Sequence, residues 1–138
     1  MMGRRFFNWY FATPEEPRPW FKVIWWWEVR RIPYNLVVGL VGFISLLLFF
    51  LFITLAHELK PGEDPVEPLA LIAAPFAINI AYTAGWMAEL LLRIVWRKRS
   101  AILGPAFLRL ALSFSLVIVL LPAILWCIIW LVRSTGVV

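Results

Sequence analysis

Residues 36–56 read LVVGLVGFISLLLFFLFITLA, and this stretch decides the class of fold. Ser45 and Thr54 carry its only polar side chains. At a rise of ~1.5 Å per residue, a helix of this length spans ~31 Å, which matches the hydrocarbon thickness of a bilayer. We therefore predict that residues 36–56 cross a membrane as a helix.

Two further apolar runs lie at residues 69–94 and 107–132. Each exceeds the minimum length of a span, so we expect these helices to tilt, to kink or to project into the headgroup layer. Only 15% of the residues are charged, against about 25% in a typical globular domain. The predicted fold class is an all-α integral membrane protein, with three transmembrane helices in a domain of residues 35–134.

Basic residues gather on one side of these spans. Those that precede the first span are Arg4, Arg5, Arg18, Lys22, Arg30 and Arg31, and the run 97–99 separates the second span from the third. Residues 57–67, between the first two spans, are acidic with a single lysine. The positive-inside rule therefore places the N-terminus in the cytoplasm and the C-terminus outside, and we interpret the membrane as a bacterial inner membrane. Basic segments beside apolar runs also argue against a nucleic-acid partner.

The N-terminal arm, residues 1–34, is aromatic and basic. Pro19 suits the first position of a helix, and Pro33 is expected to end one. Residues 20–32 are too few to cross a bilayer and too apolar for open water, so we predict an amphipathic helix in the cytoplasmic headgroup layer. Its expected interface anchors are Trp20, Trp25, Trp26, Trp27, Arg30 and Arg31.

The chain contains nine tryptophans, and two interpretations of them differ in kind. Stacked indoles suit a pocket for a pigment, a quinone or a sterol. Most of them, however, fall at the expected membrane interfaces, where tryptophan is normally enriched. We favour an aromatic belt in contact with lipid or with a protein partner, and the sequence leaves the identity of any cofactor open.

The second span carries the most informative polar residues. Asn79 and Tyr82 lie within it, and Glu89 is the only acidic residue inside any span. An isolated charge in a membrane costs at least ~2.5–3.5 kcal/mol, so Glu89 should have partners. Arg93 follows by four residues and Arg109 should lie at similar depth on the third span, which predicts a clasp between the two helices. The alternative is a proton or cation site at Glu89 with Asn79 along the path.

Small residues predict where the first two spans meet. Gly39 and Gly42 should lie level with Gly85 and Ala88, because consecutive spans run antiparallel. Small side chains let helix backbones approach closely, and close packing is the main attraction between helices in lipid. We therefore expect the tightest contact between these helices on the inner side.

No catalytic constellation emerges from the sequence. His57 and Cys127 lie at the outer ends of the first and third spans, with no third group to orient them, so we expect neither a nucleophilic pair nor a metal site. We interpret the chain as a non-catalytic accessory subunit that contacts membrane lipid and other subunits of a larger membrane complex. The alternative is a small homo-oligomeric channel or transporter component in which Asn79, Tyr82 and Glu89 line a path.

Overall fold

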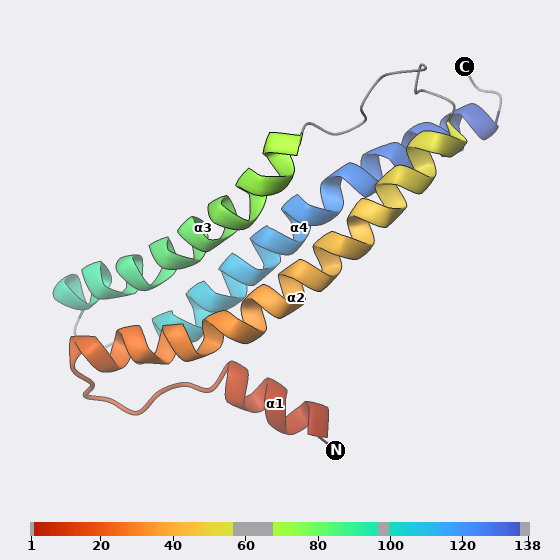
Figure 1. The fold of residues 1–138 in the computed structure, drawn as a ribbon. Helices are drawn as coiled ribbons and strands as arrows, with labels where there is room; N and C mark the ends of the chain where they lie inside the picture. Colours follow the sequence, from red (N-terminus) through yellow and green to blue (C-terminus); the bar gives the residue numbers. More distant parts are fainter. Residues whose placement is uncertain (1, 57–67, 97–99, 136–138) are drawn as a thin grey trace.

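The computed structural model describes residues 2–56, 68–96 and 100–135. In these residues it contains the helices α1 (Met2–Tyr10), α2 (Trp20–Leu55), α3 (Pro68–Val95) and α4 (Ser100–Ser134), and no strand. Three of them, α2, α3 and α4, are long and apolar enough to cross a membrane. Figure 1 shows these as long rods, with α1 as a short separate helix whose C-terminal end lies near α2. The fold class predicted from the sequence is confirmed.

The short N-terminal helix is not where the sequence places it. Residues 20–32 are the first part of α2, which continues through Pro33, and the separate short helix is α1. Proline removes one backbone hydrogen bond, but interior prolines are tolerated where neighbouring helices pack around the freed groups. Residues on both sides of Pro33 are buried against the rest of the protein, and this packing keeps the helix intact.

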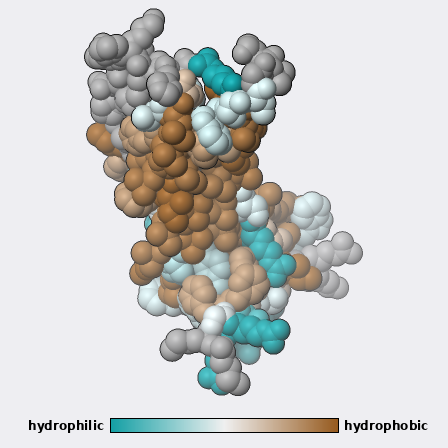
Figure 2. All heavy atoms as spheres, turned by 90° about the vertical axis from the view of Figure 1, so that its right-hand side faces the viewer, coloured by the Kyte–Doolittle hydropathy of each residue, from teal (hydrophilic) through white to brown (hydrophobic). Residues whose placement is uncertain are grey.

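The length of α2 has a consequence for depth in the bilayer. Its 36 residues measure ~54 Å, well above the ~30 Å of a hydrocarbon core. Because residues 36–56 already suffice for a span, the excess lies at the N-terminal end of the helix. Figure 2 shows the result as a broad hydrophobic band with paler and hydrophilic residues gathered beyond it. We call the end that holds residues 20–35 the inner end.

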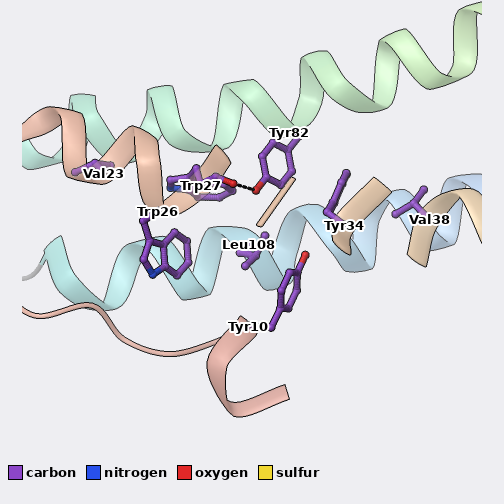
Figure 3. Packing of buried hydrophobic residues seen from close by; sticks show 8 residues of the cluster. All are labelled: Tyr10, Val23, Trp26, Trp27, Tyr34, Val38, Tyr82 and Leu108. Atoms are coloured by element: carbon purple, nitrogen blue, oxygen red, sulfur yellow. Dashed lines mark hydrogen bonds between the residues drawn. The ribbon is translucent and has the colours of Figure 1, made fainter. Parts of the chain in front are cut away.

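The best-packed part of the molecule lies at this inner end. Its buried cluster consists of Tyr10, Val23, Trp26, Trp27, Tyr34, Val38, Tyr82 and Leu108, so it joins the arm and all three long helices (Figure 3). The Tyr82 ring centroid lies 5.2 Å from that of Trp27 and 4.5 Å from that of Tyr34. Tilted and edge-to-face pairs at such distances are favourable beyond the area that they bury.

Helices α2 and α4 stay together along their whole length. Near the inner end the hydroxyl groups of Tyr34 and Ser115 lie 2.6 Å apart. At the outer end Nη1 of Arg133 donates to the carbonyl of Ala56 at 3.2 Å, which satisfies a backbone oxygen just beyond the last turn of α2. The two helices therefore form one continuous pair.

Helix α3 joins this pair only through its inner half. Tyr82 and Glu89 are fully buried, whereas every residue of 72–77 is exposed. These positions cover more than one helical turn, so this part of α3 is exposed on all of its faces. Figure 1 accordingly shows the N-terminal end of α3 apart from α2 and α4.

The predicted small-residue contact between the first two spans is therefore wrong. A Cβ atom on Gly39 would meet nothing within 4 Å, and one on Gly42 would lie 3.7 Å from Val119 of α4. Gly85 instead accommodates the indole ring of Trp27. The reason is the register of the two antiparallel helices. Trp27 of α2 lies level with Gly85 of α3, so Gly39 and Gly42 lie level with the N-terminal part of α3. That part of α3 has already separated from α2. The expected tight inner contact exists, but an indole makes it.

Arg30 holds the arm on α2. Its Nε donates to the carbonyl of Tyr10 and its Nη2 to that of Trp9, both at 2.8 Å, and its Nη1 donates to the carbonyl of Trp26 at 3.0 Å. The last carbonyls of a helix lack intrahelical partners, and a cation there also complements the helix dipole. The guanidinium carbon lies 4.7 Å from the ring centroid of Trp9 and 3.9 Å from that of Trp26, close enough for cation–π attraction.

Replacing Arg30→Gln should release α1 from α2. The change removes two hydrogen bonds between a cation and the end of α1, each worth about 1.5–3 kcal/mol. Since about 1.4 kcal/mol is a factor of ten, hydrogen exchange of the α1 backbone amides should accelerate at least tenfold. The control is Arg5→Gln, an exposed arginine on the same helix. Equal exchange in the two variants would contradict this role of Arg30.

Candidate functional site

A buried carboxylate organises the inner end. Glu89 of α3 is fully buried, and its Oε1 accepts hydrogen bonds from Nη2 of Arg18 and, at 3.3 Å, from Nε and Nη2 of Arg93. Its Oε2 accepts a hydrogen bond from the indole nitrogen of Trp27 at 2.7 Å. Donors from the arm, from α2 and from α3 thus converge on one side chain.

Glu16 extends this set of ion pairs toward the surface. It accepts hydrogen bonds from Nε of Arg18 at 3.0 Å and from Nη2 of Arg93 at 2.5 Å. We call Glu16, Arg18, Trp27, Glu89 and Arg93 the polar cluster. Burial raises the pKa of Glu16, but the hydrogen bonds from the two arginines outweigh this effect and hold that pKa below its usual value. Two carboxylates and two guanidinium groups therefore balance each other.

The balance matters because Arg18 and Glu89 lie away from water. The side chains of Arg18 and Glu89 are 4% and 0% exposed. Removing one partner of a buried ion pair costs about 3–5 kcal/mol, because the other charge stays buried without compensation. The arm can therefore leave the three helices only at a large free-energy cost. The polar cluster therefore stabilises the attachment of the arm to the membrane domain.

Helix α4 passes close to the polar cluster at Gly104, which has no side chain. A Cβ atom on Gly104 would lie 2.8 Å from Oε2 of Glu89 and 3.4 Å from Nη2 of Arg18. Gly104 and Pro105 therefore lie inside α4 rather than before it, and the backbone passes directly over the carboxylate. Sequence reasoning missed this role, because the third apolar run was taken to begin at residue 107, after Gly104.

Only one pair of the predicted clasp forms, and it lies within α3 instead of joining two helices. Arg93 contacts Glu89, but the guanidinium of Arg109 lies 5.1 Å from the ring centroid of Phe11 in the arm. Arg109 follows Gly104 by five residues, and at ~100° per residue this places it ~140° around α4 from the carboxylate. Arg18 of the arm occupies the position beside Glu89 that was predicted for Arg109. The sequence indicated that a buried glutamate needs a cation, but it did not single out Arg18 among the arginines of the arm.

The other intramembrane polar groups also turn inward. The amide oxygen of Asn79 accepts a hydrogen bond from Asn35 at 3.1 Å, and its nitrogen donates to the carbonyl of Pro75 at 3.0 Å. The hydroxyl of Tyr82 donates to the carbonyl of Trp27 at 2.5 Å. These contacts fix α3 against α2 over the inner half of the helix.

The predicted interface anchors divide into two groups. Trp20 and Trp25 are among the most exposed side chains, and their role as lipid anchors stays a prediction. Trp26, Trp27 and Arg30 are buried and serve contacts within the protein, which corrects their assignment as lipid anchors. Arg31 is half-buried and bonds to Thr83 and Glu28. The aromatic residues at the start of α2 thus divide between an exposed face and a buried face, because one side of the helix faces outward and the other packs on its neighbours.

Of the two remaining candidates, only Cys127 belongs to the part of the chain that the structure describes. Cys127 is half-buried in α4, while His57 lies outside the described residues. Within residues 2–56, 68–96 and 100–135, no group of three His, Cys, Asp or Glu residues could hold a metal ion. Comparisons of the chain with protein-family models, with curated proteins and with solved structures find no match.

A pair of glycine substitutions tests the polar cluster. Gly104→Ala should lower the thermal stability of the detergent-solubilised protein, because the added methyl group overlaps the Glu89 carboxylate and overpacking costs about 1–3 kcal/mol. Gly39→Ala is the matched control, since its Cβ would meet open space and alanine favours a helix by up to about 1 kcal/mol. Equal melting temperatures for the two variants would show that α4 is not tightly packed against the carboxylate of Glu89.

Proposed function

We propose that this chain is a non-catalytic accessory subunit of a larger membrane complex. The main support is the outer half of α3, where residues 72–77 are exposed on every face. The same helix is firmly held at its inner half. A helix that is fixed at one end and unpacked at the other offers a ready surface for a transmembrane helix of a different protein.

The composition of this surface suits a helical partner. Ala73 and Ala77 are exposed and lie one helical turn apart on the same face of α3. Small residues at this spacing let a second backbone approach closely, which provides packing and short polar contacts in lipid. Phe76 and Ile72 are more than half exposed beside them and add apolar area to such a contact. Bulk lipid gains less from a small-residue face, because its mobile chains cannot pack there as a fixed helix can.

The polar residues support this role better than a channel. A path through a homo-oligomer needs Asn79, Tyr82 and Glu89 to face a shared aqueous space. Tyr82 and Glu89 are instead fully buried, and both bond to Trp27 of the same chain. Their contacts give the monomer a fixed shape. We therefore propose a structural function and keep the channel as the alternative that the first experiment below addresses.

The orientation is part of the proposal. Arg4, Arg5 and Lys22 are exposed at the inner end, and the positive-inside rule favours the cytoplasmic side for such residues. The unpacked half of α3 then lies in the outer leaflet. A bacterial inner membrane agrees with this arrangement.

The partner surface can be tested by one substitution on α3. Ala77→Phe should abolish co-purification of partner subunits in a mild detergent, because a large ring prevents close approach of a second helix. The matched control is Ala84→Phe, an exposed alanine two turns farther toward the inner end. Native mass spectrometry of the wild-type chain should show different subunits bound to it, and the control should retain them.

Two results would contradict the proposal. Retention of the same subunits by Ala77→Phe would exclude this surface as the contact. A closed ring made of this chain alone in the wild-type spectrum would favour the channel alternative.

Labelling of single cysteines tests the orientation. In a Cys127→Ser background, Thr135→Cys should react with a membrane-impermeant maleimide added to intact cells, whereas Gly3→Cys should react only after the cells are opened. Both positions are exposed, and a Cβ at Gly3 meets nothing within 4 Å, so neither change should disturb the fold. The reverse pattern of labelling would invert the proposed topology.

A further inference from the structure

A groove separates the arm from the first turns of α2. It has a volume of about 600 Å³ and is open to the surface. The arm contributes Trp9 and residues 14–18, and α2 contributes Lys22, Trp25, Trp26, Val29 and Arg30. Two residues of the polar cluster, Glu16 and Arg18, line this groove, whereas the outer half of α3 does not.

The charges around the groove do not cancel. Glu16 and Arg18 are bound within the polar cluster, whose carboxylates and guanidinium groups are equal in number. Arg30 donates to three backbone carbonyl groups, which satisfy its hydrogen bonds but do not neutralise its charge. Of the remaining charged residues, Lys22 is positive and Glu15 negative. The groove therefore keeps a net positive charge and favours an anion.

Arg18 adds a second, independent indication. It lines the groove and its side chain is only 4% exposed, yet its Nη1 nitrogen has no hydrogen-bond partner in the described part of the chain. A buried guanidinium nitrogen without a partner is unfavourable, and a phosphate oxygen is a suitable acceptor for it. The wall of the groove thus includes a residue with an unsatisfied donor, in addition to the excess positive charge.

The depth of the groove and its aromatic wall indicate the source of the anion. The groove lies beside the first turns of α2, beyond the residues that suffice to cross the hydrocarbon core. Lipid headgroups occupy this level. The indoles of Trp9, Trp25 and Trp26 also line it, and such rings suit the boundary between acyl chains and headgroups. A soluble phosphate would gain nothing from this apolar wall.

We propose that this groove binds the phosphate headgroup of an anionic phospholipid. Lys22 and Arg18 are the residues that would contact the phosphate, and Arg30 would add its positive charge. The indoles would pack on the glycerol and on the upper part of the acyl chain. This site is independent of the accessory role, since it lies on the arm and on α2 rather than on α3.

The test uses the full chain, delipidated in detergent and titrated with short-chain phosphatidylglycerol under native mass spectrometry. Lys22→Gln should weaken binding about fivefold, the loss expected when one basic residue near a membrane surface is neutralised. Arg5→Gln is the control, because it removes the same charge from the exposed face of α1 outside the groove, and it should bind as the wild type does. Lys22 is exposed, so its variant should fold and melt normally.

Three results would overturn the proposal. Equal affinity of Lys22→Gln and Arg5→Gln would remove the groove as the site. Equal binding of short-chain phosphatidylcholine by the wild type would remove the preference for an anionic headgroup. Equal binding of glycerol phosphate, which has no acyl chains, would assign the groove to a soluble phosphate instead of a lipid.

Discussion

The buried carboxylate of Glu89 constrains the rest of the molecule. A buried charge is stable only when opposite charges and hydrogen-bond donors surround it. The donors here come from Arg18 in the arm, Trp27 in α2 and Arg93 in α3, while α4 can pass close by because residue 104 has no side chain. One carboxylate thereby joins four parts of the chain at one end of the bundle. The aromatic core forms around this point.

Arginines have a second role, which is to satisfy helix ends. Arg30 bonds to the last carbonyls of α1, and Arg133 bonds to the carbonyl of Ala56 just beyond α2. Neither contact involves a carboxylate. In a chain with only eight acidic residues, backbone carbonyls at helix termini are the other favourable places for a guanidinium group. At the inner end, this use of Arg30 explains how an arginine without a carboxylate partner fits into the packed cluster.

The sequence was sufficient for features that depend on local composition. Length and apolarity predicted three spanning helices, and the cost of burying Glu89 predicted a cationic partner, of which Arg93 at the next turn was the correct one. Most contacts between distant parts of the chain could not be predicted from the sequence. Arg18 lies between two prolines in a segment without periodicity, and nothing local indicates that this segment folds back over α3. Helix α2 continues through Pro33 because neighbouring helices pack around it, an effect that propensity cannot express.

The two halves of α3 differ because its polar contacts are distributed unevenly. From Asn79 toward the inner end, hydrogen bonds and ion pairs attach α3 to α2 and to the arm. Beyond Asn79 the side chains are apolar or small, and lipid competes on equal terms with α2 and α4 for their surface. The bond between Asn79 and Asn35 is the last polar link before this change, and such bonds contribute only about 0.6–2 kcal/mol in a membrane. The outer half of α3 is therefore the part of the domain whose position an external helix can determine most easily.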